Sequence, residues 1–518
     1  MKEHKTVVGK KLIEILMFSM YPDEKIIYRE YIQNARDSIK DAVEAGVLNQ
    51  LKDGHIVVNI DSYNHKITIT DNGIGVPVEK VEPVLLNIAD STKDGIDSAG
   101  QFGIGRLVGG GYCKKLSFKT SYKGEKYASE ISFDVEAARA ILDDDTDRRS
   151  AAEVIDAIRG IELYEEEADK HYFIVTLDQV RPEYPELLNQ ETISDYLRDV
   201  APVDYQFIFK NNLVQTKIPT DYIELQKQAG YFKVTVNEET DIRKRYGLKI
   251  DGTQDTIDDL AYFKISDDDY GLLAWGWYAV TAFSKAIPAT DRNRGIRLRK
   301  HNILIGASNL LNQFFKEPRG NNYFYGEIHA VHPKLKPESS RSGLAPTPEA
   351  IRFQQHLKDF FLNLHSLYHL ASDMKTATRD VVAIEVEKAQ ATEQEDTPEV
   401  TRKWEVANKK LEKATNKVQT EAEQKVAEIY KKKLEESIKN SSVNLVSDIV
   451  EPYTQSVKVR EHSRALPEDI FFDLKDSYSS SEIELIKRIF KSFTDNCPIA
   501  QKKLIEELKK KVIKDLGK

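Results

Sequence analysis

Apolar and polar positions near the N-terminus repeat with the period of a helix and then with that of a β-hairpin. Residues 24–45 carry apolar side chains at helical spacing, which predicts a helix with one face suited to packing on a sheet. The apolar stripe consists of Ile32, Ala35, Ile39, Ala42 and Val43. Residues 55–60 and 66–70 instead alternate with period two around a polar turn, and this pattern predicts two antiparallel strands.

The opposite side of the predicted helix is acidic. It consists of Glu30, Asn34, Asp37 and Asp41, which fall within roughly 60° of one another on a helical wheel. Uncompensated like charges on adjacent turns cost about 0.2–0.5 kcal/mol per pair, so this face invites a bound cation. A solvated acidic face is the simpler interpretation, and the residues that follow decide between the two.

Two glycine-containing motifs follow the hairpin. The second strand runs into Asp71-Asn72-Gly73-Ile74-Gly75, which places a carboxylate at a strand tip beside a backbone that a ligand can approach closely. A simple turn is the alternative interpretation. Farther along, Ser91-Thr92-Lys93 precedes the glycine-rich segment 100–105, whose main-chain N–H groups suit phosphates. The sequence lacks a Gly-x-x-x-x-Gly-Lys-Ser/Thr loop, which excludes the P-loop class.

The order of these motifs is more specific than any one of them. Together they resemble the GHKL ATPases, the superfamily of gyrase B, histidine kinases, MutL and the ninety-kilodalton heat-shock chaperone. The similarity is closest to the chaperone, whose nucleotide-binding motifs look like residues 28–38, 71–76, and 88–93 with 100–105. The resemblance implies an α+β protein that begins with a GHKL (Bergerat) α/β sandwich.

The resemblance also implies a role for each motif residue. Glu30 would be the general base that orients or deprotonates water for attack on the γ-phosphate of ATP. Asn34 would supply an oxygen ligand to Mg²⁺, and Asp37 would support that site from beside it. Asp71 would accept a hydrogen bond from the adenine amino group. The other implied ATP-binding residues are Gly73, Gly75, Ser91, Thr92, Lys93, Gly100, Gln101, Phe102, Gly103, Ile104 and Gly105. Residues 77–100 would form a mobile lid.

One motif of the family is missing. The family carries a Gly-Thr pair before the final strand of the sheet, with the threonine near the adenine. The corresponding segment here, residues 170–177, reads Lys-His-Tyr-Phe-Ile-Val-Thr-Leu. Weaker contacts on the adenine side are therefore expected. Between residues 134 and 167 the sequence also predicts a helical insertion, to which no chemistry is assigned.

The region 192–372 mixes strand-like runs with helical ones, which is an α+β pattern. Its expected strands include residues 207–209 and 272–280. The basic run 292–300 is either a strand with one charged face or, by resemblance, part of the chaperone's middle domain. In that domain an arginine of a Ser-Arg loop reaches the γ-phosphate. Arg341 is the candidate for this role, with Arg299 or Lys300 as the second possibility.

The C-terminal part is helical and charged. Apolar residues at seven-residue spacing in 402–440 predict an antiparallel helical hairpin or a short coiled coil, either of which suits dimerisation or partner binding. Residues 466–516 read as a small helical domain, whose lysines indicate a solvated face more than a nucleic-acid site. The expected domains are a GHKL ATPase domain at 1–190, an α+β middle domain at 191–371, a helical arm at 372–445 and a C-terminal helical domain at 446–518.

Composition narrows the possible functions. A net charge of −9 gives no global case for nucleic-acid binding, and no apolar run reaches the length of a membrane span. Cys113 and Cys497 allow neither a disulfide framework nor a zinc cluster, so a cytoplasmic protein is expected. His329 and His332 lack a further ligand at metal-binding spacing and are interpreted as structural.

The predicted function is that of an ATP-binding and ATP-hydrolysing molecular clamp related to the heat-shock chaperone. ATP and Mg²⁺ would be required, a homodimer would open and close, and a protein client would be remodelled. The alternative is a MutL- or MORC-like ATPase clamp acting on DNA, in genome maintenance or phage defence. A histidine kinase is disfavoured because no phospho-acceptor helix precedes the ATP-binding motifs, and Glu30 disfavours a non-hydrolysing scaffold.

Overall fold

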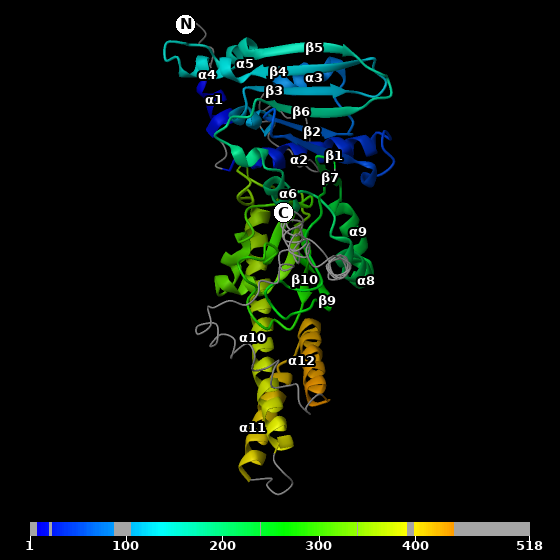
Figure 1. Ribbon diagram of the computed structural model, residues 1–518, viewed down its shortest axis with the longest axis vertical. Helices are drawn as coiled ribbons and strands as arrows, with labels where there is room; N and C mark the ends of the chain where they lie inside the picture. Colours follow the sequence, from blue (N-terminus) through cyan, green and yellow to red (C-terminus); the bar gives the residue numbers. More distant parts are fainter. Residues whose placement is uncertain are drawn as a thin grey trace, which may run out of the picture. The chain divides into compact units, whose positions relative to one another are not determined.

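The structure is a computed structural model that describes residues 8–19, 23–87, 105–238, 240–338, 340–390 and 398–439 (Figure 1). Residues 1–438 form one compact unit, which contains two β-sheets and a set of helices. No helix among the described residues is both long enough and apolar enough to span a membrane. The predicted domain at 446–518 lies outside the described residues.

The first sheet has eight strands in the order β5-β4-β3-β6-β2-β1-β7-β8. All neighbours are antiparallel except β1 and β7, which are parallel. The strands are β1 (His55–Asp61), β2 (Lys66–Asp71), β3 (Lys115–Ser121), β4 (Tyr127–Asp134), β5 (Arg159–Glu165), β6 (Tyr172–Asp178), β7 (Lys233–Val236) and β8 (Thr240–Asp241). The hairpin predicted from residues 55–70 is confirmed as β1 and β2.

The helix predicted at residues 24–45 is α2 (Ile26–Glu44), and it packs on this sheet. Its apolar stripe lies in the core together with side chains of β1 and β2, such as Ile56 and Ile69. Only Val43 of the stripe is half-buried. The other helices of this part are α1 (Lys11–Glu14), η1 (Ile15–Ser19), η2 (Leu51–Asp53), α3 (Val78–Leu86), η3 (Gly105–Tyr112), α4 (Val135–Asp143), α5 (Ala151–Ile158), η4 (Pro185–Leu188) and α6 (Gln190–Val200).

The predicted helical insertion at residues 134–167 is only partly helical. It contains α4 and α5, and then the chain continues as β5, the edge strand of the sheet. The start of α5 is fixed by a capping box, in which Ser150 and Glu153 each bond the backbone N–H of the other. The segment therefore adds one edge strand to the first sheet.

The second sheet has five strands in the order β12-β11-β13-β10-β9. They are β9 (Asp259–Asp267), β10 (Gly271–Val280), β11 (Gly295–Lys300), β12 (Ile303–Leu304) and β13 (Tyr325–Ala330). Strands β11 and β13 are parallel, and the other neighbours are antiparallel. The helices before and between these strands are α7 (Phe207–Phe209), η5 (Lys210–Val214), α8 (Gln215–Lys217), α9 (Thr220–Ala229), η6 (Leu310–Phe314) and η7 (Pro318–Tyr323).

The strand predicted at residues 207–209 is wrong, because this segment is helical and continues into the π-helix η5. A strand would place the first and third residues on one face. Instead Phe207 is 61% exposed and Phe209 is fully buried, one helical turn before the buried Leu213. The apolar run alone did not distinguish the two periods.

A single long helix, α10 (Pro348–Gln390), leaves the second sheet, and α11 (Pro398–Thr415) and α12 (Glu421–Lys439) follow it. Three ion pairs join α10 to the chain that returns along it: Glu387 with Lys403, Asp380 with Lys410, and Asp373 with Lys417. From one ion pair to the next, the residue number falls by seven in α10 and rises by seven in the returning chain. The two segments therefore form an antiparallel helical pair with a heptad repeat. The predicted boundary at 371 falls inside α10, and β7 joins the first sheet beyond residue 190. The α+β fold class with C-terminal helices is confirmed, whereas the domain boundaries stay predictions.

Candidate nucleotide site

The polar face of α2 is covered rather than solvated. Glu30 and Asp37 are 4% and 2% exposed, Asn34 is half-buried, and only Asp41 at the end of the face is exposed. Asp37 accepts a hydrogen bond of 2.8 Å from Arg36, and both side chains are buried. Buried carboxylates need such partners, because an uncompensated charge inside a protein is costly.

The side chain that pairs with Glu30 is Arg341, which belongs to the part of the chain that contains the second sheet. Arg341 Nε donates a hydrogen bond of 3.1 Å to Glu30 Oε1, and both residues are buried. The backbone of Arg341 has φ +61°, an uncommon conformation for a residue other than glycine. Its carbonyl oxygen accepts hydrogen bonds from the N–H of Gly306 at 2.8 Å and from Arg29 Nη2 at 3.3 Å. Hydrogen bonds from both parts of the molecule therefore hold this strained residue in place.

The last glycine of the predicted phosphate loop also lies against Glu30. Gly105 begins η3, and a Cβ atom added to it would lie 2.4 Å from Glu30 Oε2. The absence of a side chain thus lets the backbone pass directly beside the carboxylate. The other predicted phosphate-loop residues, Ser91, Thr92, Lys93, Gly100, Gln101, Phe102, Gly103 and Ile104, lie outside the described residues.

The Asp71 motif turns back onto α2. Asp71, at the end of β2, is buried, and its Oδ1 accepts a hydrogen bond of 2.8 Å from the N–H of Gly73. The N–H of Ile74 then donates to the carbonyl of Ser38 in α2 at 3.0 Å. Gly75 has φ +72°, and a Cβ there would lie 1.9 Å from the carbonyl oxygen of Ser121, so only glycine fits. The turn fixes the Asp71 carboxylate beside Gly73 and Gly75, which have no side chains.

Thr120 is a residue of this site that the sequence did not reveal. Phe173 of β6 stands opposite Asp71, so the missing threonine of the family has no replacement at that register position. Thr120 of β3 lies on the other side of Phe173, and its hydroxyl accepts from the N–H of Val76 at 2.9 Å and donates to the carbonyl of Tyr172 at 3.0 Å. Its role depends on which strands are neighbours, and no local motif encodes that pairing.

The two other candidate cations have different surroundings from Arg341. Arg299 is fully buried in β11 and donates to Glu327 Oε1 at 2.7 Å and to the carbonyls of Asn302 and Asp199, each at 3.0 Å. Lys300 Nζ donates to the carbonyls of Val331 and His332 at 3.3 and 2.9 Å. The basic run does form a strand, β11, with Arg297 and Arg299 at alternate positions, and every residue of this strand is buried.

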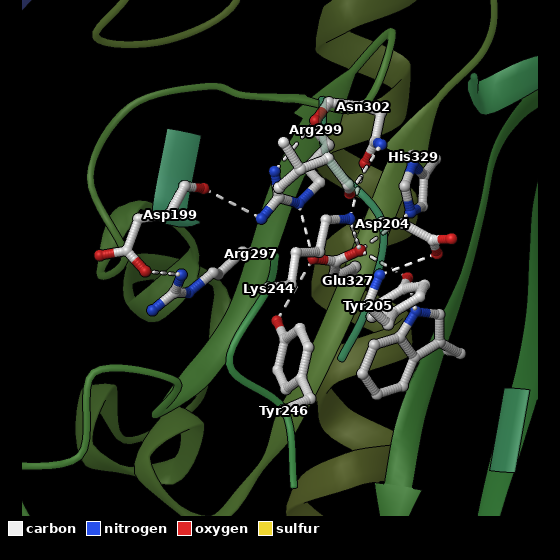
Figure 2. A network of polar contacts seen from close by, with 12 residues as sticks. Asp199, Asp204, Tyr205, Lys244, Tyr246, Arg297, Arg299, Asn302, Glu327 and His329 are labelled. Atoms are coloured by element: carbon white, nitrogen blue, oxygen red, sulfur yellow. Dashed lines mark hydrogen bonds and ion pairs between the residues drawn. The ribbon is translucent and has the colours of Figure 1, made fainter. Parts of the chain in front are cut away.

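Figure 2 shows the buried charge network that surrounds Glu327. Glu327 accepts hydrogen bonds from Arg299, Lys244, Tyr205 and Tyr246. Burial and the neighbouring Arg299 lower the pKa of Lys244 to about 7. Burial alone would raise the pKa of Glu327, but Arg299 and Lys244 outweigh it and hold that pKa well below its usual range.

His329 lies at the edge of this network. Its Nε2 is 3.3 Å from Glu327 Oε2, and its ring stacks on Trp275 with a centroid distance of 4.6 Å. Burial lowers its pKa to about 4, so the ring is neutral at pH 7. The surroundings of His329 are thus an aromatic ring and a carboxylate that other cations already neutralise.

Residues 26–159 match the family model described as histidine kinase-, DNA gyrase B-, and HSP90-like ATPase. This part of the chain, which contains Glu30, Asn34, Asp71 and Gly105, is a GHKL-type ATPase domain.

Over its N-terminal part the chain is distantly homologous to the bacterial chaperone protein HtpG. It is 33% identical to HtpG of Clostridium acetobutylicum over 112 residues, which are 19% of this chain and 18% of that protein. Identity to HtpG of Fusobacterium nucleatum subsp. nucleatum is 30% over 141 residues, or 23% of each chain. A longer match, to HtpG of Oceanobacillus iheyensis, is 25% identical over 240 residues, 41% of this chain and 36% of the relative. These matches span about a fifth to a third of the relatives' own length.

The donor set of the site suits a hard cation and a nucleotide. Carboxylate and carboxamide oxygens are the ligands that Mg²⁺ prefers, and α2 presents them from Asn34 and Asp37 on the face that also carries Glu30. Glycines stand where the backbone passes closest to Asp71 and Glu30, since a Cβ at Gly73 or Gly105 would meet those carboxylates within 2.6 Å. The residues present are therefore compatible with a magnesium–nucleotide complex.

Proposed function

We propose that this chain is an ATP-hydrolysing molecular clamp in which a middle-domain loop completes the active site of the ATPase domain. The observation that carries the proposal is the hydrogen-bonded ion pair between Glu30 and Arg341, which joins residues 311 positions apart. A base and a cation that come from two parts of the molecule can meet only when those parts are together. Hydrolysis would thereby depend on domain closure.

The proposed division of work follows from the chemistry of each group. Glu30 orients and deprotonates the attacking water. Arg341 is held beside it and supplies positive charge at the γ-phosphate, where negative charge accumulates during transfer. Asn34, with Asp37 beside it, would hold Mg²⁺, which would supply positive charge against the phosphates. Asp71 accepts a hydrogen bond from the adenine amino group, next to the glycine backbone.

The proposed substrate of the clamp is a protein client, and the proposed working unit is a homodimer. Support for a client comes from the distant homology to HtpG, which is named as a chaperone. The antiparallel helical pair formed by α10 and α11 supplies a charged arm on which such a unit could be built. Binding of DNA whose affinity falls steeply with salt would instead favour the clamp that acts on DNA.

The experiment that tests the proposal compares steady-state ATP hydrolysis and ATP binding in the wild type and in Glu30→Ala. Turnover should fall by about 100-fold or more, because general-base catalysis contributes about 10²–10⁴-fold, while the nucleotide still binds. Glu44→Ala is the matched control, since Glu44 is an exposed acid at the end of the same helix. Retained turnover in Glu30→Ala, or a wild type that does not bind ATP, would overturn the proposal.

A further inference from the structure

The Arg341 loop is held by a short hairpin of the second sheet, which we call the β11–β12 hairpin (Arg299 to Leu304). Arg299 pairs with Leu304 and Lys300 with Ile303, so the turn consists of His301 and Asn302 alone. Both turn residues have positive φ, +52° and +62°, as a two-residue turn between twisted antiparallel strands requires. Such a conformation persists only where surrounding contacts enforce it.

Asn302 supplies those contacts. Its Oδ1 accepts a hydrogen bond of 2.6 Å from Lys244 Nζ, and its Nδ2 donates to the carbonyl of Gly230 at 2.9 Å. Arg299 Nη1 donates to the backbone carbonyl of Asn302 at 3.0 Å. Figure 2 shows Asn302 beside Arg299 and Lys244, the two cations that bind Glu327. The turn is thus tied to the fully buried charge network.

The far side of the hairpin packs against α2, the helix that carries Glu30. Leu304 belongs to the core of the first sheet, together with Ile32 of α2. Arg29, Gln33, His301, Leu304 and Arg341 all line one cavity between the hairpin and α2, and it measures only about 10 Å³. A cavity of that size holds about one water molecule, so the two surfaces fit closely.

The hairpin leads directly to Arg341. The chain leaves β12 through Ile305, whose N–H donates to the carbonyl of Leu298 at 2.8 Å. The next residue, Gly306, has φ +65°, and its N–H donates to the carbonyl of Arg341 at 2.8 Å. A Cβ on Gly306 would lie 2.8 Å from the carbonyl oxygen of Ser342, so the two loops are in close contact.

We infer that Asn302 is a positioning residue for ATP hydrolysis. It fixes the β11–β12 hairpin between the Glu327 network and α2, and through Gly306 it fixes Arg341 against Glu30. This inference rests on the proposed function of Arg341. The side chain of Asn302 bonds to Lys244 and to the carbonyl of Gly230, so its effect is on the placement of the Arg341 guanidinium group. A displacement of about 1 Å in such a group can lower a rate about 100-fold.

The test uses Asn302→Gly in the full chain, because glycine tolerates the positive φ and removes only the side chain. The expected result is a fall in kcat of about tenfold or more, with KM for ATP changed less than about twofold. Asn237→Gly is the matched control. Asn237 also has positive φ, at +50°, and loses comparable hydrogen bonds, to Ile60 and Gln190. It lies between β7 and β8, away from the Arg341 loop, so its kcat should equal that of the wild type.

A double-mutant cycle shows whether Asn302 acts through Arg341. If it does, Asn302→Gly combined with Arg341→Ala should be no slower than Arg341→Ala alone. A normal kcat in Asn302→Gly would overturn the inference. So would a double variant whose loss equals the product of the two single losses.

Hydrogen exchange at the Gly306 amide separates this inference from the proposed function. Exchange should accelerate about tenfold in Asn302→Gly and stay unchanged in Asn237→Gly, because only the first releases the hairpin. Unchanged exchange in Asn302→Gly overturns the inference whatever the activity of the enzyme. Accelerated exchange together with wild-type turnover in Arg341→Ala would instead count against the proposed role of Arg341.

Discussion

Two buried carboxylates, Glu30 and Glu327, occupy opposite kinds of surroundings. Glu327 accepts hydrogen bonds from four side chains, all of which lie in the region of the second sheet. Glu30 meets a guanidinium from a loop 311 residues away, beside Gly105, whose added Cβ would lie 2.4 Å from its carboxylate. The first arrangement saturates its carboxylate with local partners. The second joins two parts of the chain that lie far apart in the sequence.

The difference indicates what each carboxylate contributes. A fully hydrogen-bonded buried charge is expensive to disturb and gives the fold a unique arrangement. A carboxylate held by one distant cation is a point at which two parts of a molecule can come together and separate. Substitutions at Glu327 should therefore change stability, whereas substitutions around Glu30 should change turnover.

The largest effect is expected from Glu327→Gln. Loss of its charge removes the carboxylate that binds both Lys244 and Arg299, and breaking such a buried pair costs about 3–5 kcal/mol. The free energy of unfolding by urea should fall by that amount. The control is Glu317→Gln, because Glu317 forms an exposed ion pair with Arg319 and its loss should change stability little. Equal losses in the two variants would mean that the buried carboxylate matters no more to stability than the exposed one.

Arg341→Ala should have the next largest effect, which we expect in catalysis. Removing a cation aimed at developing phosphate charge is expected to lower kcat by about 100-fold, while ATP binding changes little. Arg319→Ala removes an exposed arginine and serves as the control. A change confined to KM would mean that Arg341 binds ATP without contributing to the transition state.

The pH dependence of stability should reveal the protonation of His329. Its pKa is about 4 in the folded protein and about 6.5 when unfolded, so the unfolded state binds more protons between these values. Stability should therefore rise with pH through this window, and His329 should account for a loss of about 1–2 kcal/mol between pH 6.5 and pH 5. His329→Phe keeps an aromatic ring against Trp275. In this variant the free energy of unfolding, measured with urea at each pH, should rise less steeply with pH than in the wild type. An unchanged pH dependence would mean that a group other than His329 titrates in this range.

Gly105→Ala should have the smallest effect. Its new Cβ would lie 2.4 Å from Glu30 Oε2, and because that atom is the end of a flexible side chain it can move aside. Turnover should then fall by about tenfold or less, since the base is displaced rather than removed. Gly9→Ala has open space around its Cβ and should turn over like the wild type. A Gly105→Ala variant as slow as Glu30→Ala would mean that the glycine itself is essential.

Local patterns predicted α2, the first hairpin and the α+β class, because side-chain period and turn chemistry are properties of neighbouring residues. The stripe of Ile32, Ala35 and Ile39 and the turn after β1 are visible in the sequence alone. The pattern failed at Phe207–Phe209, where three apolar residues fit a strand or a helix equally well.

What the sequence could not supply is contact between distant residues. Arg341 was selected by resemblance, but its 3.1 Å approach to Glu30 depends on the packing of the two sheets. The roles of Thr120, Lys244 and Asn302 depend on strand order and turn geometry in the same way. Arg299 and Lys300 look like surface cations in the sequence, and only the parallel pairing of β11 with β13 explains their burial.

The length of α10 has a mechanical consequence. Its first half, from Ala350 to Met374, is part of the second core, and its second half carries α11 through Val381 and Ile384. With 43 residues and a rise of about 1.5 Å each, the helix is about 65 Å long. It acts as a rigid lever, so a tilt of the whole helix by about 5° about its N-terminal end would move its far end by about 6 Å. Small rearrangements beside the Arg341 loop can therefore become large displacements of the helical arm.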